Sequence, residues 1–314
     1  MPPTDLISLG STDIQVSPLG IGTWAWGDKV FWGYGSGYGE TDLAQVFSTC
    51  LDAGINFFDT AEIYGLGQSE QLLGSFASGY ADNPVAIATK FMPVPWRWSS
   101  SSLQSALRHS LSRLGRARVE LYQIHWPLPP ISLEVWANAL ADAVNAGLTQ
   151  AVGVSNYSTD QMRRSHETLH KRGIPLASNQ VQYSLLCRDP ERNDLLKACQ
   201  DLGITLIAYS PLGMGLLTGK YSPEHPPTGA RGVTMRNKLE TVQPLVALLR
   251  EIGAGHDHKT PAQVALNWVI CKGALPIPGA KTLRQAEENA GALGWRLSSA
   301  EVSALDQISD QCGF

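Results

Sequence analysis

The feature that most constrains the fold of this chain is a regular alternation of short apolar runs with longer amphipathic stretches. The apolar runs begin near Leu19, Asn56, Ala86, Leu121, Gln150, Ala177, Thr205 and Leu275. Most of them are almost continuously apolar, as parallel strands buried on both faces should be. Between them lie stretches such as ETDLAQVFSTCLDAG, SSLQSALRHSLSRLG and RNDLLKACQDLG, which end at a glycine, where helix C-caps are common. This pattern predicts an α/β fold of the (β/α)8 TIM barrel type.

Three segments fall outside the alternation. LISLGSTDIQVS precedes the first unit and predicts a β-hairpin with its turn at Gly10 to Asp13, suited to plug the bottom of the barrel. The stretch from Ser298 to Ile308 predicts an additional C-terminal helix. The connection from Pro211 to about Glu240 is long and rich in glycine and proline, and such loops are usually functional or disordered. Nothing resembles an interdomain linker, so we expect residues 1–314 to form a single barrel domain.

Composition narrows the classes of function. The 314 residues are 43% hydrophobic and 17% charged, which is ordinary for a globular enzyme. The net charge of -4 is interspersed, which offers no basic face for nucleic acid and no polybasic run for a membrane. The cysteines of the chain are scattered and form no C-x-x-C pair, so we expect reduced thiols and no metal site. With no secretory signal and no membrane-spanning apolar run, we expect a cytoplasmic protein that acts on a small molecule.

Polar and aromatic side chains follow the apolar runs, at the end of a barrel where active sites lie. They are Trp24, Asp59, Lys90, His125, Ser155, Asn156, Gln180, Tyr209, Ser210 and Lys281. Any single one could be a helix cap or a core polar group satisfied by its neighbours. A set that converges on one end of the barrel instead predicts an active site.

Asp59 and Lys90 end adjacent predicted strands, where burying either charge alone would be costly, so we expect them to pair. The alternative is a plain structural ion pair. Tyr64 follows Asp59 in DTAEIYG and can swing back over the barrel mouth. A neighbouring ammonium should lower the pKa of Tyr64 from about 10 and make it a usable proton donor near neutrality. His125 supplies an N–H that can hold a carbonyl oxygen.

These residues and the segments around them resemble the aldo-keto reductase superfamily. The segments are FFDTAEIYGLGQSEQLLG, VGVSN, NQVQYSLL and IPGAKTLRQAEENAGAL, and the resemblance covers nearly the whole chain from Leu6. The IPGAK form is similar to a branch that includes bacterial reductases, plant chloroplast-type reductases and potassium-channel β-subunits. The resemblance implies an NADP-dependent oxidoreductase that reduces aldehydes or ketones to alcohols by hydride transfer from NADPH. Its partner would be a small-molecule carbonyl substrate.

The resemblance also implies a role for each site residue. The catalytic tetrad would be Asp59, Tyr64, Lys90 and His125, with Tyr64 as the general acid. Substrate contacts would be Trp24, Tyr64, His125 and Trp126. Tyr209 would stack on the nicotinamide, whose carboxamide would bind Ser155, Asn156 and Gln180. The implied cofactor contacts are Gly22, Thr23, Trp24, Asp59, Ser155, Asn156, Gln180, Tyr209, Ser210, Leu212, Gly213, Gly215, Gly279, Lys281, Gln285, Glu288 and Asn289.

The dinucleotide would be bound without a Rossmann unit, because no G-x-G-x-x-G follows a predicted strand. The run YSPLGMGLLTGK would instead bring backbone close to the pyrophosphate. Lys281 would contact the ribose 2'-phosphate. Many family members carry an arginine where Gln285 stands, so a preference for NADPH would depend heavily on Lys281. The alternative for Lys281 is an ordinary solvated lysine.

Aromatic residues gather just beyond the predicted strand ends, at Trp24, Trp26, Phe31, Trp32, Trp96, Trp98 and Trp126. Some of them should pack against one another, and the others predict an apolar pocket suited to hydrophobic or aromatic carbonyl compounds. The loop GDKVFWGYGSGYGE could close over the site or be disordered.

Two rival functions stay open from the sequence. One is a regulatory module in which a barrel keeps a nucleotide as a redox sensor for a partner protein. The other is a barrel aldolase that uses Lys90 as a Schiff-base amine. Multiple turnover separates the first from a reductase, and borohydride trapping of substrate on Lys90 separates the second.

Overall fold

Eight parallel strands form the central sheet of the computed structural model, which describes residues 6–80, 85–97, 99–227 and 236–313. In chain order the strands are β3 (Ile21–Gly22), β4 (Phe57–Asp59), β5 (Ala86–Phe91), β6 (Val119–Ile124), β7 (Thr149–Ser155), β8 (Leu176–Gln182), β9 (Thr205–Tyr209) and β10 (Leu275–Ile277). Each strand pairs with its neighbour in sequence. The first and last strands meet at a parallel bridge between Gly22 and Gly279, and the Gly20 amide donates to the Pro276 carbonyl at 3.0 Å. The sheet therefore closes into the barrel that the alternation predicts.

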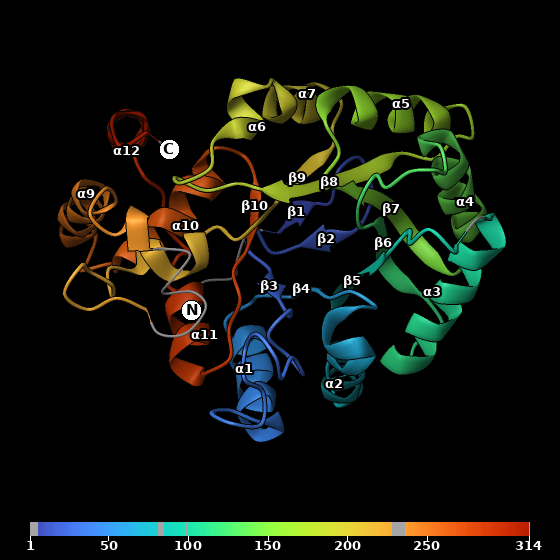
Figure 1. Ribbon diagram of the computed structural model, residues 1–314, viewed down its shortest axis with the longest axis horizontal. Helices are drawn as coiled ribbons and strands as arrows, with labels where there is room; N and C mark the ends of the chain where they lie inside the picture. The colour runs from blue at the N-terminus through green and yellow to red at the C-terminus, as the bar shows by residue number, and fades with distance from the viewer. Residues whose placement is uncertain (1–5, 81–84, 98, 228–235, 314) are drawn as a thin grey trace.

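Helices surround the strands, as Figure 1 shows. They are α1 (Glu40–Asp52), α2 (Gln68–Ser78), α3 (Ser100–Leu114), α4 (Leu133–Asn145), α5 (Thr159–His170), α6 (Asp189–Arg192), α7 (Leu195–Asp201), α9 (Gln243–Gly255), α10 (Pro261–Cys271), α11 (Leu283–Ala290) and α12 (Ser299–Gln311). Three short 3-10 turns are η1 (Tyr64–Gly67), η2 (Gly213–Thr218) and η3 (Arg236–Lys238). The helix predicted near the C-terminus is α12.

Local sequence signals set the helix ends. Ser158, Thr260 and Ser298 each accept a hydrogen bond from the amide three residues later, and each forms a capping box. The predicted stretch RNDLLKACQDLG is not one helix, because Asp194 takes a left-handed conformation (φ 57°) that separates α6 from α7.

The predicted hairpin consists of β1 (Ile7–Ser8) and β2 (Gln15–Val16), which pair antiparallel. The amide of Gly10 donates to Oγ1 of Thr205, at the first residue of β9, with a distance of 2.7 Å. Leu9 and Val16 are fully buried and pack against the side chains of the barrel interior. Figure 1 shows the hairpin inside the outline of the strands. The hairpin thus plugs the amino-terminal end of the barrel and leaves the carboxyl end for the site.

A charged cluster holds α12 against the barrel wall. Arg188 is 8% exposed and donates to both carboxylate oxygens of Glu191, at 3.0 and 2.9 Å, and to the Asp306 carbonyl oxygen at 2.8 Å. It also pairs with Asp310 at 3.1 Å, and Lys272 bridges Glu191 and Asp306 at 2.8 and 3.0 Å. Glu191 belongs to α6, whereas Asp306 and Asp310 belong to α12. The cluster therefore ties the last helix to the segment that follows β8.

Within the described part of the chain, no helix combines the length and apolar character needed to cross a membrane.

Candidate active site

A cavity of about 740 Å³ opens at the carboxyl end of the strands. Its volume lies in the usual range of roughly 300–1,000 Å³ for sites that bind small molecules and cofactors. Most residues predicted for the site line it: Gly22, Trp24, Asp59, Tyr64, His125, Trp126, Ser155, Asn156, Gln180, Tyr209, Ser210, Leu212, Gly215, Gly279, Lys281, Gln285, Glu288 and Asn289. Residues from every part of the chain thus converge on one mouth.

Asp59 and Lys90 form a buried ion pair at the base of this cavity. The Lys90 ammonium lies 2.5 Å from Oδ2 of Asp59 and donates to the Thr60 carbonyl at 2.8 Å. The hydroxyl oxygen of Tyr64 lies 3.4 Å from the same ammonium. Tyr64 reaches this position because η1 turns back toward the barrel, with left-handed backbone at Gly65 and Leu66. The three side chains therefore share one hydrogen-bonded arrangement, as the strand ends predict.

The environment of Lys90 keeps its amine protonated. Burial alone would lower the pKa of Lys90, but the Asp59 carboxylate and Tyr64 oppose this, and the pKa is raised above its ordinary value. A Schiff-base lysine must be a neutral amine before it can attack a carbonyl. The geometry therefore disfavours the aldolase alternative.

The pKa of Tyr64 departs from the sequence-based expectation. Burial raises it above the ordinary value, while the Lys90 ammonium lowers it and Asp59 raises it again. The expected net lowering from about 10 is therefore wrong for the protein alone, because the desolvation of the phenolate outweighs the neighbouring cation. Tyr64 is held as a neutral phenol with a hydroxyl proton to donate.

His125 is held neutral beside Tyr64. The two rings make an edge-to-face contact with centroids 5.8 Å apart. Burial and the nearby Lys90 charge lower the pKa of His125 to about 3. Nδ1 of His125 is buried, with no hydrogen-bond partner among the residues the structure describes. A neutral imidazole carries one N–H, which can donate to a carbonyl oxygen.

A cluster of hydrogen-bonded polar side chains lies at the carboxyl ends of β7, β8 and β9. The Asn156 amide nitrogen donates to the His125 carbonyl and to Oγ of Ser155, both at 3.0 Å. Tyr209 donates its hydroxyl to Oδ1 of Asn156 at 3.0 Å, and Ser155 donates to the Gln180 carbonyl at 2.9 Å. Asn156 adopts a left-handed backbone conformation (φ 62°), which asparagine tolerates better than most residues. The cluster places amide and hydroxyl groups next to an aromatic ring on one side of the mouth.

Sequence reasoning missed Gln123, a fully buried side chain in β6. Its amide nitrogen lies 3.3 Å from Oδ1 of Asp59, and Gln180 donates to the same oxygen at 2.8 Å. Ser178 in turn donates to the Gln123 amide oxygen at 3.3 Å. This series of hydrogen bonds can cross the barrel only because residue 153 is glycine. A Cβ at residue 153 would lie 2.2 Å from Oγ of Ser178. The only sequence signal was a polar residue inside an apolar strand.

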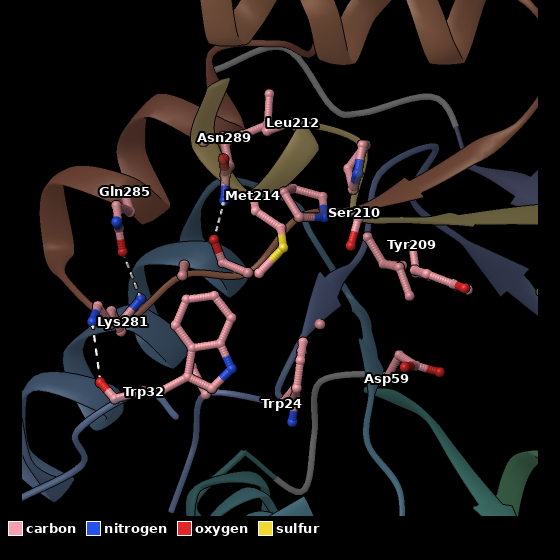
Figure 2. A pocket seen from close by; sticks show the side chains of 18 of the residues that line it. Trp24, Trp32, Asp59, Tyr209, Ser210, Leu212, Met214, Lys281, Gln285 and Asn289 are labelled. Atoms are coloured by element: carbon pink, nitrogen blue, oxygen red, sulfur yellow. Dashed lines mark hydrogen bonds between the residues drawn. The ribbon is translucent and has the colours of Figure 1, made fainter. Parts of the chain in front are cut away.

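The other end of the cavity is built by the segment before α11 and by η2, as Figure 2 shows. Gln285 accepts a hydrogen bond from the Lys281 amide at 2.9 Å, and the Asn289 side chain reaches the Gly279 carbonyl at 3.4 Å. In η2 the backbone of Gly213 and Met214 is left-handed (φ 54° and 55°). Two further cations line the cavity and were missed, Lys220 and Arg284. Neither belongs to a run of basic residues that would have singled it out.

Some predicted residues lie elsewhere. Thr23 is buried behind the cavity, where it donates to the Asp59 carbonyl, and neither Gly213 nor Lys90 is part of the lining. Trp26 is wrong as a mouth residue, because it is fully buried and donates to the Ala280 carbonyl at 2.9 Å. Trp96 is exposed outside the cavity lining. Trp98 and part of the Pro211 to Glu240 connection lie outside the described residues.

Comparison with known protein families shows which family the chain belongs to. The model of the Aldo/keto reductase family matches residues 18–310. The chain belongs to this family. The aldo/keto reductase is 45% identical over 311 residues to a chloroplastic pyridoxal reductase of Arabidopsis thaliana, covering 95% of this chain and 84% of the relative. Because that relative is chloroplastic, the cytoplasmic location stays a prediction.

Solved structures agree with the barrel. A glycerol dehydrogenase from Gluconobacter oxydans superposes with a TM-score of 0.85 at 26% identity, covering 99% of this chain and 96% of that one. An aldo/keto reductase from Klebsiella pneumoniae, in complex with NADP and acetate, gives a TM-score of 0.75 at 26% identity, covering 96% and 94%.

Proposed function

We propose that this protein is an NADPH-dependent reductase of aldehydes or ketones, with Tyr64 as the general acid. The observation that carries the proposal is the Tyr64 hydroxyl, 3.4 Å from the buried Lys90 ammonium and exposed to the cavity. A proton donor at a cavity wall, with a neutral histidine beside it, suits the protonation of a carbonyl oxygen.

The cavity residues fit a nicotinamide dinucleotide. Lys281, Arg284 and Lys220 supply positive charge for phosphate groups, and η2 brings glycine backbone to the cavity at Gly215. At the other end, Ser155, Asn156 and Gln180 offer the hydrogen-bonding groups that a carboxamide requires, next to the Tyr209 ring. NADPH bound there would supply a hydride. The Klebsiella relative was crystallised with NADP, which supports this choice.

The side chains of the protein itself carry out the remaining steps, which are proton transfer, orientation of the carbonyl and stabilisation of the phenolate. Tyr64 donates the proton to the carbonyl oxygen, and His125 orients that oxygen through its N–H. Lys90 stabilises the phenolate that this transfer leaves, because its ammonium is adjacent and cannot easily lose its proton. Asp59 keeps Lys90 charged and in place.

The substrate class follows from the walls near Tyr64. Trp24, Ile63 and Trp126 line that part of the cavity, and each is more than 40% exposed. Flat apolar walls favour an aromatic carbonyl compound, and the Arabidopsis relative is named a pyridoxal reductase. Since His125 is neutral, these residues offer no cation to pair with a substrate phosphate. We therefore propose pyridoxal, rather than its 5'-phosphate, as the first substrate to test.

The test follows NADPH absorbance with pyridoxal, pyridoxal 5'-phosphate, benzaldehyde, butanal and acetone. We expect multiple turnover, with a higher kcat/KM for pyridoxal and benzaldehyde than for butanal or the phosphate ester. Tight NADPH binding without multiple turnover on any carbonyl compound would reject the proposal and favour the redox-sensor alternative.

A further inference from the structure

The loop between β3 and α1 carries the aromatic side of the cavity. We define the aromatic loop as residues 27–39. Asp28 organises it, because Oδ1 accepts the amides of Phe31 and Trp32 at 2.7 and 3.1 Å. Trp32 and Tyr34 pack against the core, whereas the glycines between them and after them face open space, since a Cβ at Gly33 or Gly35 would have no neighbour within 4 Å. A glycine-rich loop of this kind loses much conformational entropy when it is ordered, so its contacts with the barrel matter.

Lys281, in the segment between β10 and α11, contacts this loop directly. Its ammonium lies 3.4 Å from the Trp32 carbonyl oxygen, 4.7 Å from the centre of the Tyr38 ring and 5.8 Å from the Trp32 ring. Figure 2 shows the Trp32 ring between Lys281 and Trp24. Tyr38 is 7% exposed and donates its hydroxyl to the Ala25 carbonyl. The lysine therefore contacts both the buried Tyr38 and the partly buried Trp32 of the loop.

From Trp32 the aromatic contacts continue to the catalytic tyrosine. Trp32 packs edge-to-face on Trp24 with centroids 5.4 Å apart, and Phe31 stacks on Trp24 at 5.3 Å. Trp24 lies 6.4 Å from the ring of Tyr64. Ring pairs at these separations are attractive and hold one another in orientation. The position of Trp32 thus affects the wall that faces the reacting carbonyl.

We propose that Lys281 has a second role as a positioning residue, in which it holds Trp32 and the aromatic loop in place and so shapes the substrate pocket. The inference rests on the proposed function, since it assumes that the carbonyl compound binds beside Tyr64 and Trp24. Both roles are compatible, because an ammonium has three N–H donors and the Trp32 carbonyl takes one. A residue that distinguishes the cofactors would then also tune the affinity for an aromatic substrate.

NADH separates the two roles, because it has no 2'-phosphate for Lys281 to bind. With NADH as cofactor, Lys281→Met should raise the KM for benzaldehyde by about 3- to 10-fold, because the long 3.4 Å contact with the Trp32 carbonyl contributes no more than an ordinary hydrogen bond, and should change kcat less than about twofold. Lys281→Arg keeps a cation and a donor, so its KM should stay within about twofold of wild type. Lys171→Met, which removes an exposed lysine next to α5, is the control for lost charge.

A second readout needs neither cofactor nor activity. Lys29 is exposed within the aromatic loop, so trypsin can report on the loop by the appearance of a fragment ending at Lys29. We expect faster cleavage there in Lys281→Met than in wild type, Lys281→Arg or Lys171→Met.

The outcomes separate this inference from the proposed function. If wild type reduces benzaldehyde and Lys281→Met leaves the KM with NADH unchanged, the positioning role is overturned. If wild type reduces no carbonyl compound, the proposed function fails. The cleavage rate at Lys29 then decides whether Lys281 holds the loop.

Discussion

At the scale of single residues, the site depends on opposing effects of burial and charge. Lys90 stays charged because Asp59 outweighs desolvation, whereas Tyr64 stays neutral because desolvation outweighs Lys90. A charged ammonium next to a neutral phenol is the arrangement that a proton donor requires, because the cation acts only when the phenolate forms.

Replacing Tyr64 with Phe tests the proton donor. The ring and its contacts stay, and only the hydroxyl is lost. We expect kcat to fall by at least roughly 10²- to 10⁴-fold, the usual contribution of general acid catalysis, while the Kd for NADPH stays nearly the same. Steady-state kinetics and fluorescence titration measure both, and near wild-type turnover would contradict the role of Tyr64.

His125 gives a prediction for acid stability. Its folded-state pKa of about 3 lies below the unfolded value of about 6.5, so the unfolded chain binds more protons between these pH values. Stability should therefore fall as pH drops through this window, and His125 should account for about 2 kcal/mol of the loss at pH 5. Urea unfolding of wild type and His125→Gln at pH 7 and pH 5 measures the difference. Equal losses in both proteins would show that His125 is not the group responsible.

Lys281→Ala tests cofactor choice. The 2'-phosphate distinguishes NADPH from NADH, and hydrogen bonds to charged groups contribute about 1.5–3 kcal/mol, so NADPH should bind roughly 10- to 150-fold more weakly. The Kd for NADH should hardly change. The wild-type preference should also weaken with salt, because a solvent-accessible charge is screened. Equal weakening of both cofactors would show that Lys281 does not bind the phosphate.

The sequence predicted the Asp59, Tyr64, Lys90 and His125 arrangement because each residue follows an apolar run or a recognisable motif. It could not predict the hydrogen bonds of Gln123, because nothing local marks which face of β6 points inward. It also could not rank burial against charge at Tyr64, since the degree of desolvation depends on segments that are distant in the chain.

At the scale of elements, strand order followed from the alternation and the position of the hairpin from its place before the first unit, but the elements of the connection from β9 to β10 did not follow from either. That connection contains η2, η3, α9 and α10. The sequence analysis singled out no helix there, and the structure has α9 packed against both α10 and α12.

The connection after β9 gives an element-scale prediction. Lys220 is exposed and lines the cavity just after η2. If part of the Pro211 to Glu240 segment orders over a bound dinucleotide, as we expect, trypsin should cut after Lys220 more slowly with NADPH than without it. Cleavage after Lys171, an exposed residue at the C-terminal end of α5 that is not part of the cavity lining, serves as the internal reference. Identical cutting at Lys220 in both states would refute the prediction.

At the scale of the whole molecule, the ion-pair cluster around Arg188 joins the last helix to the barrel. Truncation of Arg188, which is itself buried, would leave the partly buried Glu191 and Asp306 with fewer partners. We expect Arg188→Ala to lower the free energy of unfolding by about 2–4 kcal/mol.

Chemical denaturation measures this loss against Lys197→Ala, which removes an exposed pair with Asp201. That control should change stability by no more than about 0.5 kcal/mol. If both variants behaved alike, α12 would be held mainly by its apolar contacts.

The closure of the barrel has a consequence for the topology of the site. Gly22 and Gly279 join the first and last strands, and both line the cavity. A ligand in that cavity would contact both sides of the junction between the first and last strands of the barrel. Cutting at Gly173, an exposed left-handed glycine, would leave Gly22 and Ser155 on one fragment and Gly279 and Gln180 on the other. Because the proposed dinucleotide would contact both fragments, the split halves should reassociate more tightly in its presence.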